Sequence, residues 1–257
     1  MELNSHISLL LLTKNEQENI KKYWTWLDRC PNINEIIVVD DNSTDGTVNE
    51  LKRLKNSHRQ IKIYTHNLAE DFAQQRTFGL SKTTNDLILW LDADEIPSNE
   101  LIKYINYIDI SQYNTVSFKR NDIFLGKELK HGETANQKFA RLFNKHNGSF
   151  KGKVHEIWCS TSSIFETDLV IHHHSHPSLF PFLQKINFYS DIRSRELYSQ
   201  GVKSNLFSII SYPLAKFILD YVFKLGFLDS TQGIIMALSM SLHSFLVRAK
   251  LWHLYQQ

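Results

Sequence analysis

The first third of the chain alternates short apolar runs with polar stretches, and this alternation constrains the fold more than any other feature. Four runs are almost continuously apolar, as expected of strands buried on both faces of a sheet. These predicted strands cover residues 7–12, 36–39, 61–64 and 87–91. The stretches between them place apolar side chains at helical spacing, and they cover residues 16–29, 47–55 and 70–82. The alternation predicts an α/β fold with a mostly parallel sheet flanked by helices.

The composition excludes several other classes of protein. The 257 residues are 42% hydrophobic and 22% charged, which does not suit a disordered chain, a collagen-like repeat or a polytopic membrane protein. A formal net charge of +2 carries no signature of nucleic-acid binding, so we expect no nucleic-acid partner. The two cysteines form no CxxC pair and the N-terminus shows no signal-peptide core. We therefore expect a cytoplasmic protein.

Carboxylates, rather than a glycine-rich loop, mark the predicted ligand edge of the sheet. The nine glycines form neither a GxG arrangement nor a Gly-Lys-Ser/Thr ending. Three acidic residues instead follow the strand 87–91 directly: Asp92, Asp94 and Glu95. Because ligands of open parallel sheets bind beyond the carboxyl ends of the strands, a divalent cation there would offset this charge and bridge a diphosphate. Acidic turns that cap the next helix are common, so these residues alone are a weak indication of a metal site.

A second polar run, residues 40–47, follows the strand 36–39. Its Asp and Asn side chains can accept hydrogen bonds from the base and ribose of a nucleotide. The same residues suit a helix N-cap at Thr44 or Asp45. Both interpretations can hold together, with Asp45 as the cap and Asp41 toward a ligand.

Four motifs in this order resemble glycosyltransferase family 2, the nucleotide-sugar-dependent enzymes with the GT-A fold. They are Leu12–Glu16 (LTKNE), Val38–Thr47, Phe72–Arg76 (FAQQR) and Asp92–Glu95 (DADE). Later motifs resemble the subgroup that builds bacterial lipopolysaccharide cores, and they are Arg141–Phe143, Val154–Glu156 and Gly226–Asp229 with Gly233. This pattern spans roughly residues 6–253. The sequence departs from it at residues 133–137, which the resemblance places toward the acceptor.

The resemblance implies a set of donor-binding and metal-binding residues. The residues implied to line the nucleotide-sugar pocket are Thr13, Glu16, Asp41, Arg76 and Asp92. Among them Asp41 would contact the base, usually uracil in this family, and Arg76 would bring a positive charge to the nucleotide. Asp94 would ligate Mn²⁺ or Mg²⁺. One histidine of the run 171–176 would join it, with His173 the better match and His172 the second.

The same resemblance implies a general base for an inverting transfer. Glu156 would deprotonate the acceptor hydroxyl as it attacks the anomeric carbon. Glu133 and Asp122 are the reserve candidates, and a local surface pair of His155 with Glu156 is the structural alternative.

The last part of the chain turns helical, so we expect a GT-A catalytic domain over residues 1–180 and a helical extension over 181–257. Residues 206–223 and 234–254 are long and apolar. They fit a helical cap on the core, amphipathic helices at a membrane interface, or a membrane span. The interfacial interpretation would make the protein peripheral at the inner face of the cytoplasmic membrane. The basic residues available to anionic headgroups are Lys203, Lys216, Lys224, Arg248 and Lys250.

Together these features predict a metal-dependent, inverting glycosyltransferase. It would move a sugar, expected to be a hexose, from a UDP-sugar to a saccharide or lipid-linked saccharide acceptor in lipopolysaccharide or cell-surface glycan synthesis. A sugar nucleotidyltransferase is one alternative, but it needs a glycine-rich phosphate loop and residues 12–19 contain no glycine. A catalytically inactive, membrane-associated binding subunit is another, although both the Asp-x-Asp pair and the candidate base are present.

Overall fold

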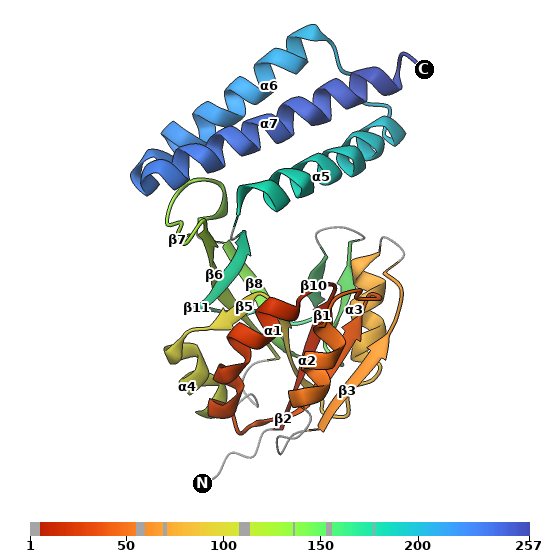
Figure 1. The fold of residues 1–257 in the computed structure, drawn as a ribbon, viewed down its shortest axis with the longest axis vertical. Helices are drawn as coiled ribbons and strands as arrows, with labels where there is room; N and C mark the ends of the chain where they lie inside the picture. The colour runs from red at the N-terminus through yellow and green to blue at the C-terminus, as the bar shows by residue number, and fades with distance from the viewer. Residues whose placement is uncertain are drawn as a thin grey trace. The chain divides into compact units, whose positions relative to one another are not determined.

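The computed structural model describes residues 6–54, 60–68, 71–107, 114–135, 137–152, 156–176 and 178–257. The chain divides into two compact units (Figure 1). The sheet unit consists of Met1–Arg120 and Gln137–His173, and the helical unit consists of Asn121–Asn136 and His174–Gln257. The segment Asn121–Asn136 therefore belongs with the C-terminal helices, although it lies in the middle of the sequence.

Four parallel strands form the first half of the sheet, in the order β3-β2-β1-β4. Their bounds are β1 Ile7–Thr13, β2 Ile33–Asp40, β3 Gln60–Thr65 and β4 Leu87–Asp92. Alternate side chains of these strands enter two separate apolar clusters. Leu9 and Leu11 enter one cluster, whereas Leu10 enters the other. This burial on both faces is the physical reason for the nearly continuous apolar runs.

Helices cover both faces of these strands. They are α1 Gln17–Tyr23, the 3₁₀ helix η1 Trp24–Arg29, α2 Thr47–Leu54 and α3 Phe72–Leu80. Ile20, Trp24 and Leu51 pack with Leu9 on one face, and α3 adds Phe78 to the cluster around Leu10. Gly79 allows α3 to approach closely, because a Cβ there would lie 2.5 Å from Leu10 Cδ1. The predicted mostly parallel α/β sheet is confirmed.

Antiparallel strands complete the sheet, in the order β4-β8-β6-β11-β5. Their bounds are β5 Glu95–Pro97, β6 Thr115–Phe124, β8 Gln137–Asn144 and β11 Phe165–His176. A separate hairpin of β9 Gly148–Lys151 and β10 Ile157–Ser160 packs its Phe150 and Trp158 against the sheet, and α4 spans Asn99–Tyr107. In this region the sequence pattern predicts a strand only over residues 114–118, which matches the start of β6. The histidine run lies on β11, which pairs with β5 so that His173 stands opposite Glu95.

Three long helices dominate the helical unit, with α7 between α5 and α6 (Figure 1). They are α5 Leu179–Ser199, α6 Leu206–Ile218 and α7 Ser230–Leu254. Shorter elements are β7 Lys127–Glu128, η3 Gly132–Thr134, the π-helix η4 Leu219–Phe223 and η5 Gly226–Asp229. The predicted helix over 206–223 is thus an α-helix with a π-helical last turn.

The glycines of the Gly226–Asp229 motif have a packing role in the helical unit. A Cβ on Gly233 would lie only 1.9 Å from the carbonyl oxygen of Gly226, so the two backbone segments meet directly. Asp229 accepts hydrogen bonds from the backbone amides of Lys130 and His131, which joins the segment before η3 to the start of α7. The motif is therefore explained by close backbone approach within this unit.

Candidate active site

The turn from β4 to β5 presents Asp92, Asp94 and Glu95 at the carboxyl edge of the parallel strands. Asp92 ends β4 and keeps 32% of its side chain exposed, whereas the side chain of Glu95 is completely buried. The amide of Asp92 donates to Oε2 of Glu95 at 3.1 Å, which closes the turn. Two carboxylates three residues apart therefore have very different environments.

Two buried arginines stabilise this turn. Arg76 of α3 donates through Nη2 to Oδ1 of Asp92 at 2.8 Å, and Arg141 of β8 donates to Oδ2 at 3.3 Å. Arg141 also binds Oε1 of Glu95. Each guanidinium carbon lies 4.1 Å from the ring centroid of Trp90, which is the geometry of a cation–π contact. A buried arginine needs carboxylate partners such as Asp92 and Glu95, because an isolated buried charge is strongly unfavourable.

These charges move the two carboxyl pKa values in opposite directions. Burial disfavours the ionised form of Asp92, but Arg76 and Arg141 outweigh it and hold its pKa well below the ordinary value. Burial raises the pKa of Glu95, and the charge of Asp92 adds to this although Arg141 opposes it. Asp92 is thus the ionised group that meets solvent at this edge, and Glu95 is an internal partner of Arg141.

Glu156 lies in the same network. Nε of Arg76 donates to Oε1 of Glu156 at 2.6 Å, so Arg76 links this carboxylate to Asp92. His155 and the preceding two residues lie outside the described residues, so its pairing with Glu156 has no structural description. The structure thus brings Arg76, Asp92 and Glu156 together. The charge of Arg76, which the resemblance assigns to the nucleotide, is engaged by two carboxylates.

Asp94 and His173, the two residues implied to bind metal, also lie side by side. His173 Nε2 is 3.4 Å from Oδ2 of Asp94, and each side chain is 15% exposed. The register of β11 with β5 explains the contact, because it places His173 beside the turn and His172 opposite Ile96. In the described part of the chain, no group of three His, Cys, Asp or Glu residues is arranged to hold a metal ion.

This donor pair fits a divalent cation that completes its coordination with substrate. One carboxylate and one imidazole are suitable donors for Mn²⁺. Mg²⁺ in phosphate-handling sites takes one or two protein carboxylates and fills its remaining positions with phosphate oxygens and water. Two protein donors beside an open edge of the sheet are therefore consistent with either ion.

The remaining predicted residues lie where β1 and β2 end. Thr13 is opposite Asp40 in the strand register and donates to Oδ1 of that residue at 2.9 Å. Asp41 is buried, and it accepts from Lys14 Nζ at 2.6 Å and from the amide of Leu68 at 2.9 Å.

Glu16, at the N-terminus of α1, accepts a hydrogen bond from Asn19 at 2.6 Å. Asp45 accepts from the amide of Thr47, the first residue of α2, as the capping interpretation predicts. Because Leu12 is opposite Asp92 in the register of β1 with β4, these residues and the Asp92 turn share one edge of the sheet.

Comparison with a family model shows which family the chain belongs to. The model of glycosyl transferase family 2 matches residues 8–173, which is more than half of the chain. The chain belongs to glycosyltransferase family 2. It is therefore a glycosyltransferase, and the nucleotidyltransferase alternative is wrong.

Two relatives and one solved structure agree with this family. The chain is 28% identical over 261 residues to an uncharacterized glycosyltransferase of Rickettsia typhi, covering 95% of this chain and 86% of the relative. It is 22% identical over 251 residues to the lipopolysaccharide core biosynthesis glycosyltransferase LpsC of Rhizobium meliloti, covering 96% and 92%. A mannosyltransferase of Pyrobaculum calidifontis, solved with GDP-Man and Mn²⁺, shares the fold with a TM-score of 0.57 at 10% identity, covering 98% and 88%. The resemblance inferred from the motifs and the GT-A-type fold are confirmed.

The structural importance of Arg141 and Trp90 does not follow from the sequence pattern of this family 2 chain. In the sequence, Arg141 belongs only to a motif and Trp90 only to the apolar strand 87–91. An arginine flanked by apolar residues on both sides, in Phe139–Phe143 (FARLF), is the available signal, since a buried arginine requires an acidic partner. Trp158, which follows the candidate base closely enough in sequence to suggest sugar stacking or a core role, is buried and stacks on Phe143 with ring centroids 3.8 Å apart, which favours the core role.

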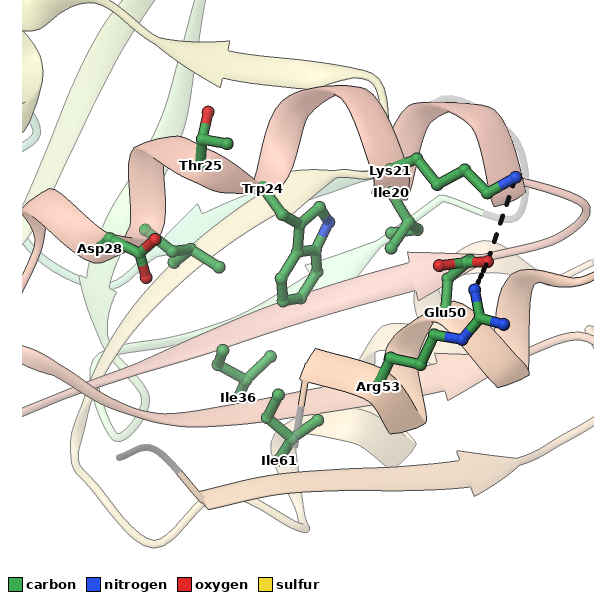
Figure 2. Close-up of a pocket in the computed structure, with 10 residues that line it drawn as sticks. Ile20, Lys21, Trp24, Thr25, Asp28, Ile36, Glu50, Arg53 and Ile61 are labelled. Atoms are coloured by element: carbon green, nitrogen blue, oxygen red, sulfur yellow. Dashed lines mark hydrogen bonds and ion pairs between the residues drawn. The ribbon is translucent and has the colours of Figure 1, made fainter. Parts of the chain in front are cut away.

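The sheet unit also contains a pocket of about 400 Å³ between α1, η1, α2 and the strands beneath them (Figure 2). Trp24, Ile36 and Ile61 give it an apolar floor, and Lys21, Glu50 and Arg53 form ion pairs at its rim (Figure 2). None of the predicted site residues lines it, so it is separate from the carboxylate edge.

Proposed function

We propose that this glycosyltransferase is metal-dependent and inverting, and that it moves a hexose from a UDP-sugar to a saccharide or lipid-linked saccharide in lipopolysaccharide or cell-surface glycan synthesis. The observation that carries the proposal is the cluster at the end of β4. There Arg76 joins Asp92 to Glu156, and Asp94 meets His173 two residues further on. A donor-side acid, a metal-binding pair and a candidate base thus occupy one edge.

On the donor side, Asp94 and His173 would hold Mn²⁺ or Mg²⁺. A cation bound there would offset the charge of the leaving diphosphate, which a chain without a glycine-rich loop must do by other means. Asp92, kept ionised by its two arginines, would face the ribose or the donor sugar. Thr13, Glu16 and Asp41 would line the nucleotide pocket, with Asp41 at the base. The Pyrobaculum mannosyltransferase, solved with GDP-Man and Mn²⁺, supports a nucleotide-sugar donor with a divalent ion.

On the acceptor side, Glu156 would act as the general base. The acceptor oxygen forms a bond to the anomeric carbon while the bond from that carbon to the diphosphate breaks, so the configuration inverts. The hydroxyl proton passes to Glu156. Since Arg76 holds Oε1 of this carboxylate, we assign the proton to Oε2. A positioned base contributes about 10²–10⁴-fold to the rate.

Support for the proposed acceptor class comes from a relative rather than from the site. Similarity to LpsC, named for lipopolysaccharide core biosynthesis, supports a saccharide acceptor on a lipid carrier. Such an acceptor would be met in the cytoplasm at the inner face of the membrane. A divergent segment at residues 133–137 leaves the acceptor sugar itself open.

Calorimetric titration tests the proposal directly. UDP, GDP and CDP are each titrated with Mn²⁺ and with chelator into the wild type, Asp94→Ala and Asp86→Ala. Asp86 is the matched control because it precedes β4 at the opposite end of the strand. We expect metal-dependent binding of UDP that Asp94→Ala abolishes and Asp86→Ala preserves. Preference for GDP or CDP would overturn only the assignment of uracil as the nucleobase of the donor. No binding of any nucleotide would overturn the proposed function.

A further inference from the structure

Helix α6 and the π-helix η4 that continues it expose an apolar stripe. Leu206, Ile210, Leu214, Ile218 and Val222 follow one another at intervals of four residues, and they are 73%, 60%, 58%, 39% and 48% exposed. Residues four apart lie on one face of a helix, so these side chains form a continuous surface. Phe207 and Phe223 flank it at 77% and 74% exposure. Apolar surfaces of this extent on a soluble unit mark a contact with a partner or a membrane.

Two helical stretches of the chain are long and apolar enough to cross a membrane, Leu206–Phe223 and Gly226–Leu254. Only 6% of the first stretch is buried within the structure, against 28% of the apolar 18-residue window in the second. A core helix of a soluble protein passes the same test of length and hydropathy, but its apolar side chains are mostly buried. The low burial of α6 therefore requires another explanation.

The charges of this segment point away from the stripe. Residues 202–257 contain two acids, Asp220 and Asp229, and both are buried. Lys216 and Lys224 each lie 2.8 Å from Glu133, and they also pair with Asp220 at 3.4 Å and 3.0 Å. The surface of this segment thus shows no acidic side chain, while Lys203 is exposed just before α6. This pattern is complementary to an anionic surface.

We propose that α6 inserts its apolar stripe into the interface of a lipid bilayer that contains anionic lipids, lying in the membrane plane. A span does not suit the helical unit, because α7 packs along α5, whose Lys185, Arg193 and Arg195 are exposed. A second copy of the chain fits less well, since a two-fold contact would meet the same surface, which exposes no acidic side chain and offers Lys203 no counter-charge. The bilayer interface accepts both the apolar stripe and the cations.

The structure also corrects the expected electrostatics of this contact. Of the five basic residues expected to meet headgroups, Lys216 and Lys224 are held by internal acids and Lys250 pairs with Asp191 at 2.8 Å. Arg248 stacks over Tyr212 with its guanidinium carbon 3.9 Å from the ring centroid. Burial of the stripe, rather than attraction of many cations, therefore dominates the binding, and its dependence on salt is weak.

Flotation of the full-length protein with phosphatidylcholine vesicles, with and without phosphatidylglycerol, tests this surface. The test variant is Phe207→Ser with Leu214→Ser. The matched control is Phe180→Ser with Phe188→Ser, which removes two exposed aromatic residues, 72% and 55% exposed, from α5. We expect the test variant to lose binding about tenfold or more and the control to bind as the wild type does.

Each outcome of this experiment bears on the proposal. An unchanged test variant, an equal loss in the control, or a wild type that does not float would overturn it. A wild-type dimer that the test variant converts to a monomer in analytical ultracentrifugation would assign the stripe to a second copy instead. Resistance of membrane-bound wild type to alkaline extraction would indicate a span. Nucleotide binding, measured on the same samples, separates this result from the proposed function.

Discussion

Each unit of the molecule contains a cluster in which two carboxylates share two cations, with Glu156 also bound to Arg76 in the sheet unit, and the two clusters serve different purposes. In the sheet unit Asp92 and Glu95 meet Arg76 and Arg141. In the helical unit Glu133 and Asp220 meet Lys216 and Lys224. In both clusters one carboxyl pKa is lowered and the other is raised.

The titration pattern in the helical unit parallels that of the sheet unit. Burial opposes ionisation of Glu133, but hydrogen bonds from Lys216 and Lys224 outweigh it and lower its pKa to about 2. Burial raises the pKa of Asp220, with Lys224 opposing and Glu133 adding to the effect. A split pair of pKa values therefore does not identify an active site here.

Position distinguishes the two clusters. Asp92 ends a parallel strand, keeps about a third of its side chain exposed and lies two residues from the Asp94–His173 pair. The side chain of Asp220 is 2% exposed inside the π-helix η4, and a Cβ on Gly226 would lie 2.6 Å from its carbonyl oxygen. We infer that the first cluster is arranged for a ligand and the second stabilises the packing of the helical unit.

Among the substitutions that test this comparison, Glu156→Gln is expected to have the largest effect, which is on turnover. The amide cannot accept the acceptor proton, so turnover should fall by about 10²–10⁴-fold while metal-dependent nucleotide binding persists. Initial rates with a UDP-sugar and calorimetry on the same variant measure the two quantities. Glu133→Gln is the control, because its carboxylate belongs to the other cluster. A greater loss of turnover in the control than in Glu156→Gln would move the base to Glu133.

Arg141→Met is expected to destabilise the sheet unit by about 3–5 kcal/mol, since removing one partner leaves Glu95 buried without its principal counter-charge. Arg53→Met is the control. Arg53 has 74% of its side chain exposed and pairs with Glu50, so its loss should cost no more than about 1 kcal/mol. Urea unfolding followed by circular dichroism measures both changes. Equal costs for the two variants would show that the network around Trp90 is not a stabilising feature.

The parallel half of the fold was predictable because its strands are buried on both faces. Leu9, Leu10 and Leu11 all contact apolar neighbours, so the local sequence alone indicates a strand. Most of the antiparallel half, apart from the start of β6, escaped prediction because its strands mix polar and apolar side chains. β8 carries Lys138 and Arg141 between its apolar residues, and its pairing with β4 is settled by contacts far along the chain.

In the candidate site, too, contacts between residues far apart in the sequence could not be predicted. Asp92, Asp94, Glu156 and His173 stand in motifs or at strand ends, so their proximity could be expected from the resemblance. The bond from Arg76 to Glu156 could not, because it joins residues 80 apart in sequence through a particular helix position. The inward orientation of Lys216 and Lys224 also depends on Glu133, which only the folded helical unit brings near.

Glu133→Gln is expected to flatten the acid limb of the stability curve. The folded pKa of Glu133, about 2, lies below its ordinary value of 4.5. A lowered carboxyl pKa contributes stability that is present above pH 4.5 and is lost as the pH falls toward 2. With a discount for solvent screening of this partly exposed side chain, the lowered pKa corresponds to about 2–3 kcal/mol. Thermal unfolding by circular dichroism between pH 3 and 7 measures it, and an equally steep acid limb in the variant would contradict the role of the lysines.

Glu35→Gln has the smallest expected effect and shows what a buried carboxylate does away from both clusters. Glu35, near the start of β2, accepts hydrogen bonds from Ser8, Lys62 and the amide of Thr84. Burial opposes its ionisation, but these donors outweigh burial and lower its pKa. Its contribution is therefore present at neutral pH and is lost as the pH falls below the ordinary glutamate range.

We expect Glu35→Gln to cost about 1–2 kcal/mol at pH 7, because charged hydrogen bonds become neutral ones. Nucleotide binding should not change, since Glu35 is at the opposite end of β2 from Asp40 and Asp41. Glu18→Gln is the control, as Glu18 has 86% of its side chain exposed and pairs only with Lys21 among the ion pairs described. Weaker nucleotide binding in Glu35→Gln at unchanged stability would mean that the ligand-binding region of the sheet extends beyond the edge with the Asp92 turn. Position at that edge would then no longer distinguish the ligand-binding cluster from the structural one.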